Sequence, residues 1–137
     1  MSAKVSFELV SPDGLTFSQE VDMVVVPGRD GDIGVLSGHA PVMSEVRPGA
    51  ICVFEGNDVS KRIFVAGGFA EVTPERCTVL SEDTVDLEEL SVAAVQEEIR
   101  DHEDDVTHAT EEAEKEAAEK ALEIARAKLE VVQDPPY

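Results

Sequence analysis

The sequence is poor in basic and aromatic residues, has two cysteines, and contains no long apolar run. Its eleven lysines and arginines stand against thirty aspartates and glutamates, which gives a formal net charge of −19. A charge of that size repels nucleic acid and anionic lipid headgroups, so nucleic-acid binding is excluded. The longest apolar run, residues 50–54, is far shorter than the roughly 20 residues that a membrane-spanning helix needs, which excludes membrane insertion.

The sequence also lacks the signs of secretion and of cysteine chemistry. The segment after Met1 has no apolar region of the kind that a secretory signal contains, which favours a cytoplasmic location. Cys52 and Cys77 lie far apart in apolar runs and match neither a metal knuckle nor a disulfide framework. We therefore expect both cysteines to be reduced thiols in the core.

Glycine and proline are absent from residues 75–133, and all nine glycines lie between Gly14 and Gly68. A chain of 137 residues has room for one ordinary domain with an appendage or for two small domains. The segregation of glycine and proline predicts two regions. They are a β-sandwich domain over residues 1–85 and a C-terminal helical hairpin over residues 86–137.

The first region contains about ten short apolar runs separated by turn residues. Val5, Phe7 and Leu9 alternate with polar neighbours, which is typical of a strand with one buried and one exposed face. Residues 11–14 (SPDG) combine a proline and a glycine in the order that a tight turn prefers. This region therefore predicts an antiparallel β-sandwich of two stacked layers.

The second region has the apolar periodicity of amphipathic helices. Asp86 and Glu89 have the spacing of a capping box, so we expect a first helix to begin near residue 86. Apolar residues recur at steps of three and four on both sides of a break at residues 104–110. The break favours two helices folded back as a hairpin, although one continuous helix of roughly 70 Å also fits the pattern. Alanine supplies much of each apolar stripe, so the hairpin is expected to dock weakly.

The stretch from Pro27 to Val42, PGRDGDIGVLSGHAPV, combines glycines, aspartates and a histidine. A phosphate-binding loop needs a helix start behind its glycines, whereas Gly34 is followed by strand-like residues. A calcium loop needs further oxygen ligands and a closing glutamate. His39 has no nearby cysteine, histidine or serine with which to form a zinc site or a catalytic triad. We therefore expect no catalytic residue, no metal site and no cofactor.

Three strings in the first region carry a resemblance to a known family. They are residues 31–41 (GDIGVLSGHAP), 47–49 (RPG) and 64–72 (FVAGGFAEV). With the helical tail, their order and spacing resemble the epsilon subunit of F-type (rotary) ATP synthases. The resemblance implies a non-catalytic rotor subunit of the central stalk, which links the gamma subunit to the membrane c-ring and couples proton translocation to ATP synthesis. It also implies a peripheral location on the cytoplasmic face of the bacterial inner membrane.

The resemblance assigns partner contacts to the stretch that begins at Gly31. It implies a c-ring contact at Gly31, Asp32, Ile33 and Gly34, and a rotor interface at His39, Ala40 and Pro41. Glycines allow a thin turn to approach another backbone closely, and Asp32 supplies a charge complementary to basic groups on the ring loops. The isolated protein is expected to be a monomer because its net charge discourages self-association.

Two departures from the family pattern concern the helical region. The family's ATP-binding motif falls on residues 87–92, where Glu88 and Ser91 replace an aspartate and an arginine. Without the arginine we expect no useful ATP binding. In the family the hairpin can extend to the catalytic alpha/beta hexamer and inhibit ATP hydrolysis through basic residues. The charged residues of segment 111–132 are mainly acidic, so weak or absent inhibition is expected.

The alternative interpretation is a free-standing ligand-binding β-sandwich with a helical oligomerisation tail. A module of that kind is expected to cluster aromatic side chains on a sheet face. The sequence has no tryptophan, and its one tyrosine is Tyr137. Co-purification with gamma and c subunits would distinguish the two interpretations.

Overall fold

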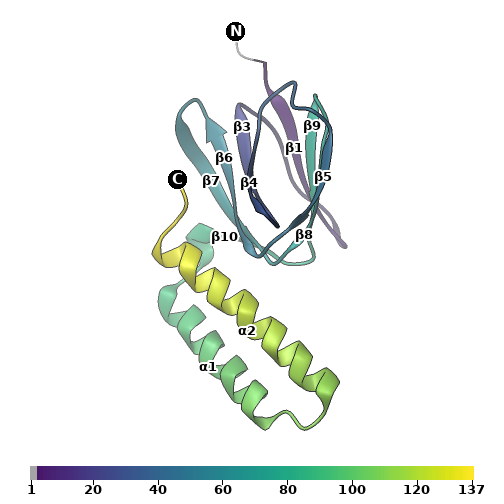
Figure 1. Ribbon diagram of the computed structural model, residues 1–137. Helices are drawn as coiled ribbons and strands as arrows, with labels where there is room; N and C mark the ends of the chain where they lie inside the picture. The colour runs from purple at the N-terminus through teal and green to yellow at the C-terminus, as the bar shows by residue number, and fades with distance from the viewer. Residues whose placement is uncertain (1–2) are drawn as a thin grey trace.

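The computed structural model describes residues 3–137. The strands are β1 (Val5–Ser11), β2 (Gly14–Val21), β3 (Met23–Gly28), β4 (Gly31–Val35), β5 (Val42–Val46), β6 (Gly49–Glu55), β7 (Asp58–Val65), β8 (Gly68–Val72), β9 (Arg76–Leu80) and β10 (Thr84–Asp86). A 3₁₀ turn, η1 (Leu87–Glu89), leads to the helices α1 (Val92–His108) and α2 (Glu112–Gln133). The expected β-sandwich followed by two helices is confirmed (Figure 1).

The ten strands form one hydrogen-bonded sheet that folds over into two layers (Figure 1). One layer contains β4, β3, β6, β7 and β10, and the other contains β5, β8, β9, β1 and β2. The layers are joined where Gly28 of β3 pairs with Val46 of β5. One pairing differs from the expected antiparallel pattern, because β1 and β9 run parallel. These strands are far apart in the sequence, so no hairpin turn forces them to run in opposite directions.

The core lies between the two layers and consists mainly of β-branched and aromatic side chains. Val5, Phe7 and Leu9 of β1 are fully buried there, as their spacing predicts. The ring of Phe17 from β2 packs on Phe7, with 5.7 Å between ring centres. Gly68 of β8 lies so close to β9 that a Cβ atom would collide with the Leu80 carbonyl oxygen.

Cys52 and Cys77 are both buried free thiols, as expected, but they lie on different faces of the sheet. Cys77 belongs to the main core. Cys52 belongs to a separate small cluster with Val25 and Phe54. Since neighbouring residues of β6 point into the main core, Cys52 points to the outer face of its layer.

The first α-helix begins later than the capping-box pattern predicts. Asp86 accepts a hydrogen bond from the Glu88 main chain at 3.0 Å, but it caps only the turn η1. Leu90 is then extended, and the Ser91 hydroxyl caps α1 by accepting from the Ala94 N–H at 3.0 Å. Serine is a strong N-cap residue, so the helix starts at the second of two competing caps.

The break between the helices is shorter than expected, because α1 continues to His108. The Thr107 hydroxyl and the His108 ring bond back to carbonyl oxygens four residues earlier, at 3.0 and 2.8 Å. These bonds satisfy the polar side chains of residues 107 and 108 within the last turn. The two helices lie side by side as a hairpin that projects from one end of the sandwich (Figure 1). Within residues 3–137, no helix is both long and apolar enough to span a bilayer.

Candidate functional site

The predicted c-ring residues lie on a corner formed by β3 and β4, which we define as residues 28–34. A tight turn joins the two strands, and Gly28 pairs with Gly31 across it. A Cβ atom at Gly28 would lie 2.6 Å from the Gly31 carbonyl oxygen, so only glycine permits this approach. Asp32 is already part of β4, where it lies opposite Pro27.

The corner presents its polar residues outward and its apolar residue inward. Gly31, Asp32 and Gly34 are exposed, whereas Ile33 packs against the main core. The strand alternation of β4 thus ties the corner to the sandwich through Ile33.

Arg47, in the short segment between β5 and β6, braces the corner. Its main-chain N–H donates to the Pro27 carbonyl oxygen at 2.9 Å. Its guanidinium donates to the Gly28 carbonyl oxygen and to Asp32 Oδ1, each at 2.7 Å. A planar fork that bonds a carbonyl and a carboxylate together fixes the corner more firmly than a lysine would. The residue was visible in the sequence only as part of the string RPG.

Asp32 has a second partner that the sequence did not indicate. The Tyr137 phenol donates a hydrogen bond to Asp32 Oδ2 at 2.7 Å. Burial opposes ionisation of Asp32, but hydrogen bonds from Tyr137 and Arg47 outweigh it and lower the pKa of this carboxyl group. The same hydrogen bond raises the pKa of the Tyr137 phenol. The Asp32 side chain is 34% exposed, and both its oxygens are engaged within the protein.

The predicted rotor-interface residues, His39, Ala40 and Pro41, lie in the loop between β4 and β5. The loop is anchored where the Gly38 N–H donates to the Pro74 carbonyl oxygen at 2.7 Å. His39 Nδ1 lies 2.7 Å from the Ala40 carbonyl oxygen, so this ring nitrogen carries the proton. Ala40 and Pro41 are exposed, and His39 is half-buried.

The structure does not bring Asp32 and His39 together into one site. Asp32 lies beside the turn at the start of β4, whereas His39 lies in the loop that follows the other end of this strand. Residues 32–35 of the strand span about 10 Å at the usual rise. The stretch that is continuous in sequence therefore places its predicted contact residues at two separate points of the surface.

Sequence reasoning missed an apolar face on the other layer, which we define as Met43, Phe69 and Leu80. Phe69 and Leu80 alternate with buried neighbours on β8 and β9, so their side chains point away from the core. Met43 of β5 lies opposite Glu71 in the β5–β8 register, which places it on the same face as Phe69. They are 71%, 53% and 53% exposed, and Phe69 lies opposite Leu80 in the β8–β9 register. Large apolar side chains that gather on neighbouring strands are typical of protein-contact surfaces. Their alternation was visible in the sequence, but not which face would remain uncovered.

No group of His, Cys, Asp and Glu side chains suited to a metal ion occurs in the part of the protein that the structure describes. Burial raises the pKa of Cys52 to about 11 and that of Cys77 to about 12, so both thiols are protonated at neutral pH. A cavity of about 530 Å³ lies between the sandwich and α2, lined by residues that include Phe69, Ser81 and Ile124.

Two family models match the sequence. Residues 4–86 match the β-sandwich domain of the ATP synthase Delta/Epsilon chain, and residues 92–136 match the C-terminal domain of the ATP synthase epsilon chain. An ATP synthase epsilon chain from Rhodospirillum rubrum is 53% identical over 129 residues, covering 94% of this chain and 96% of the relative. That of Rhodospirillum centenum is 52% identical over 137 residues, covering 96% and 94%.

Solved structures show the same fold at lower identity. A subunit in the mitochondrial ATP synthase of Euglena gracilis has a TM-score of 0.80 and 23% identity, covering 97% of this protein and 83% of that subunit. A subunit in the central stalk/c-ring structure of the Tetrahymena thermophila enzyme has a TM-score of 0.68 and 18% identity, covering 96% and 98%.

The sandwich and the hairpin thus define a protein of the delta/epsilon class of ATP synthase subunits. The two relatives that match along almost their whole length are epsilon chains, which identifies the family within this class. The protein belongs to the ATP synthase epsilon chain family, a family of non-catalytic subunits.

Proposed function

We propose that this protein is a rotor subunit of the central stalk, which links the gamma subunit to the c-ring and passes torque between them as proton translocation drives ATP synthesis. The observation that carries the proposal is that one sandwich has two exposed surfaces of different character on different layers. One is the braced polar corner at residues 28–34, and the other is the apolar face at Met43, Phe69 and Leu80. A torque-transmitting part needs at least two contacts on a body that does not deform between them.

The corner is the proposed c-ring contact. Gly31 and Gly34 let a partner backbone approach closely, and Asp32 offers a carboxylate to basic groups of a polar loop. Arg47 holds the Asp32 side chain in place, so the contact has a defined direction. A partner's basic group would share or replace one of the two donors that Asp32 now binds.

The apolar face and the loop with His39, Ala40 and Pro41 are the proposed contacts with gamma. Methionine and aromatic side chains are enriched in the centres of protein interfaces, and Phe69 with Met43 fits that composition. The anchored loop adds an exposed rim beside β5. Burial of this face against gamma would leave the corner accessible, because the apolar face and the corner lie on different layers of the sandwich.

Cysteine crosslinking tests the proposed c-ring contact. Asp32→Cys in native membranes should crosslink to a cysteine placed in a c-ring loop. This variant and its control also carry Cys52→Ala, so the other native thiol is Cys77, which is buried in the main core. Asp58→Cys, at the far end of the β6–β7 pair from Gly49, is the matched control and should not crosslink. Failure of Asp32→Cys to reach any c subunit would contradict the proposal.

We propose that the hairpin inhibits ATP hydrolysis weakly or not at all. The acidic surface of α2 opposes docking to an acidic stretch of a catalytic subunit. Deleting residues 87–137 in the assembled enzyme should leave ATPase activity nearly unchanged. A several-fold rise in activity after the deletion would overturn this part of the proposal.

We also propose that the protein has no useful ATP site at residues 87–92. The Ser91 hydroxyl, at the position of the family's arginine, is used to cap α1. Glu88 lies in the turn η1, and its main-chain N–H is bonded to Asp86. Calorimetric titration of the protein with ATP should detect no binding, and micromolar affinity would contradict this prediction.

The proposed location is peripheral, on the cytoplasmic face of the bacterial inner membrane, and the isolated protein is proposed to be a monomer. The net charge of −19 opposes self-association. Detergent extracts should yield the protein with gamma and c subunits, and sedimentation of the purified protein should give the monomer mass. Recovery of the protein alone or as a self-associated oligomer would favour a free-standing binding module instead.

A further inference from the structure

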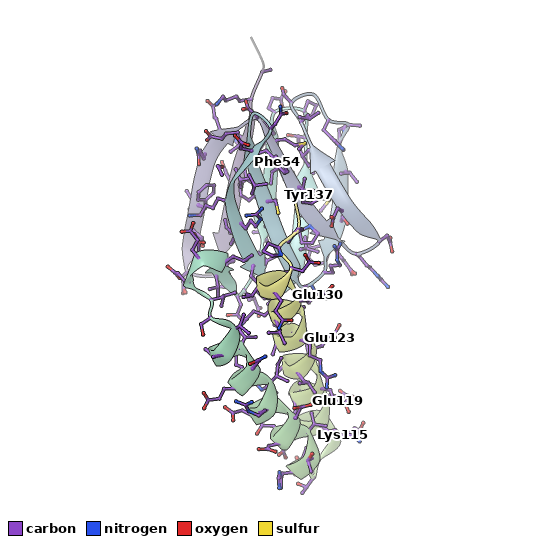
Figure 2. All side chains as sticks on the ribbon, turned by 90° about the vertical axis from the view of Figure 1, so that its left-hand side faces the viewer. Phe54, Lys115, Glu119, Glu123, Glu130 and Tyr137 are labelled. Carbon is purple, nitrogen blue, oxygen red and sulfur yellow. The ribbon has the colours of Figure 1, made fainter. Side chains whose placement is uncertain are left out.

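Residues Asp134–Tyr137, which we call the latch, leave α2 and run back along the outer surface of β6 and β7 (Figure 2). Figure 2 shows Tyr137 beside Phe54 on the sandwich, well away from the labelled helical residues Glu119 and Lys115. Pro135 and Pro136 cannot continue the helix, and their rings restrict the backbone. The latch is therefore a stiff segment, which loses little conformational freedom when it binds.

The main chain of the latch is held by one arginine of β7. Arg62 Nε donates to the Pro136 carbonyl oxygen at 3.1 Å, and its terminal nitrogen donates to the Tyr137 carbonyl oxygen at 3.0 Å. The Cys52 thiol also donates to the Pro136 carbonyl oxygen, at 3.6 Å. One guanidinium thus bonds two successive carbonyl groups, which fixes the direction of the segment.

The latch covers the small apolar cluster on the outer face of the sheet. Cys52 points away from the main core, yet it is 0% exposed. The Tyr137 ring meets Phe54 edge to face, with 5.9 Å between centres and 69° between planes. Aromatic pairs of this geometry contribute beyond the area that they bury. The latch thus lies over this outer-face thiol, with the Pro136 carbonyl oxygen 3.6 Å from Cys52 Sγ.

The latch supplies the polar connections between the helical region and the sandwich. Among residues 3–137, every hydrogen bond between residues 92–137 and residues 3–86 involves Pro136 or Tyr137. The ion pairs that Arg126 and Lys128 of α2 make, by contrast, are with glutamates of α1. The last of the latch bonds ends on Asp32 of the corner.

We propose that residues 134–137 act as a latch that fastens the hairpin to the sandwich. The latch binds Asp32 only while the hairpin is folded against the sandwich. The latch continues α2 directly, and four extended residues span at most about 14 Å. Any larger displacement of the end of α2 pulls Tyr137 away from Asp32. The position of the hairpin is thereby linked to the availability of one carboxylate oxygen on the corner.

This link has a consequence that rests on the proposed function. If Asp32 contacts the c-ring, its bond to Tyr137 and its contact with a ring loop compete for the same carboxylate. Docking on the ring then favours release of the latch, and a fastened latch weakens docking. Such competition is reciprocal because each event changes the free energy of the other by the same amount.

Thiol labelling of the purified full-length protein tests the latch without any partner. Cys52 lies under the latch and Cys77 lies in the main core, so one molecule carries both a reporter and an internal reference. Each variant is pulsed with N-ethylmaleimide at neutral pH, and the two labelled peptides are quantified by mass spectrometry. Tyr137→Phe removes the bond to the corner and Asp32→Asn removes its charged acceptor, and each should raise the Cys52 labelling rate several-fold. The Cys77 rate should not change.

Two further variants make the test specific. Arg62→Gln removes the guanidinium that bonds the main chain of the latch at Pro136 and Tyr137, and should raise the Cys52 rate more than Tyr137→Phe. Asp30→Asn, an exposed position two residues from Asp32, makes the same change of charge and should have no effect. Unchanged Cys52 labelling in Tyr137→Phe, Asp32→Asn and Arg62→Gln would overturn the proposal, as would equal acceleration of both thiols.

The competition is tested separately in membranes that contain the assembled enzyme. Cys52 of the unmodified protein should label faster there than in the isolated protein, because the ring holds Asp32. If Cys52 were labelled as slowly in the assembled enzyme as in the isolated protein, the proposed competition would be wrong. The proposed latch in the isolated protein would still stand. The crosslink from Asp32→Cys to a ring loop tests the proposed function independently of both results.

Discussion

The sandwich and the hairpin differ in how much apolar surface they bury and in how their parts are held together. The sandwich buries branched and aromatic side chains from both of its layers in one core. In the described part of the hairpin, only Val95, Leu122 and Ala125 are buried. Burial of apolar area is the main stabilising contribution, so the sandwich is a rigid platform and the hairpin is its low-stability neighbour. One short protein thus combines a closely packed part with a part that buries little apolar surface.

The largest expected difference between the two regions comes from the same substitution made in each. Leu9→Ala, in the fully buried core, should lower the free energy of unfolding by about 4 kcal/mol. Leu122→Ala, in the hairpin, should lower it by only about 1 to 2 kcal/mol, because the helices can separate while the sandwich stays folded. Urea unfolding followed by circular dichroism measures both. Equal losses in one cooperative transition would show that the two regions unfold as one.

A second prediction concerns how closely the sandwich is packed. Gly68→Ala places a methyl group against the Leu80 carbonyl oxygen at φ +137°, and we expect a loss of roughly 3 kcal/mol from strain and displaced backbone. Gly14→Ala has a similar backbone angle, φ +123°, but meets no atom within 4 Å. It should cost about 1 kcal/mol. If the two variants were equally stable in thermal unfolding, close packing of β8 on β9 would not matter to stability.

A smaller effect is expected at Lys128, which touches both regions. Its ammonium group pairs with Glu98 at 3.1 Å, lies 5.8 Å from the centre of the Phe64 ring, and is 14% exposed. Lys128→Met should lower stability by about 1 kcal/mol through the unpaired Glu98 and the lost ring contact. Arg126→Met breaks an exposed pair with Glu103 and should change stability by less than about 0.5 kcal/mol. Differential scanning calorimetry of the hairpin transition measures the effect of each variant. If Arg126→Met cost as much stability as Lys128→Met, the contacts of Lys128 with Glu98 and Phe64 would not be the more stabilising ones.

The smallest expected effect is the pH dependence of the contact between Tyr137 and Asp32. The pKa of Tyr137 is raised above its ordinary value of 10.0, so its stabilising contribution is complete below pH 10 and is lost as pH rises through the raised pKa. The pKa of Asp32 is lowered below 3.8, so its contribution is present above that pH and is lost as pH falls through the lowered pKa.

Tyr137 is the one tyrosine, and there is no tryptophan, so phenolate absorbance reports on this residue alone. A spectrophotometric titration should give a pKa above 10 for the unmodified protein. Asp32→Asn should bring that pKa back toward the ordinary value, because the charged acceptor is lost. Asp30→Asn is the control, and equal shifts in the two variants would indicate only a general effect of charge.

Local patterns predicted the secondary structure well because each depends on near neighbours. The alternation of Val5, Phe7 and Leu9 predicted a strand with a buried face, as observed. The absence of glycine and proline from residues 75–133 predicted the helices. The start of α1 was predicted too early, because Asp86 and Ser91 are both good caps and the extended backbone at Leu90 separates them.

The environment of the predicted site residues could not be inferred in the same way. Asp32 was expected to supply a charge complementary to basic groups on the ring loops, but the sequence did not indicate that Arg47 and Tyr137 each bind one of its oxygens. The partner Tyr137 lies more than a hundred positions away, and the contact depends on where α2 ends and on how the prolines direct the backbone. No local pattern contains that information.

The sequence by itself determined the acidic character of this protein, the division into strands and helices, and the family to which the glycine-rich strings point. These properties follow from composition, periodicity and short-range spacing. Only the tertiary structure decided which face of the sheet stays bare, why an outer-face cysteine is inaccessible, and that Tyr137 holds Asp32. Those outcomes depend on contacts between segments distant in the sequence, whose relative positions are set by the packing of all the elements together.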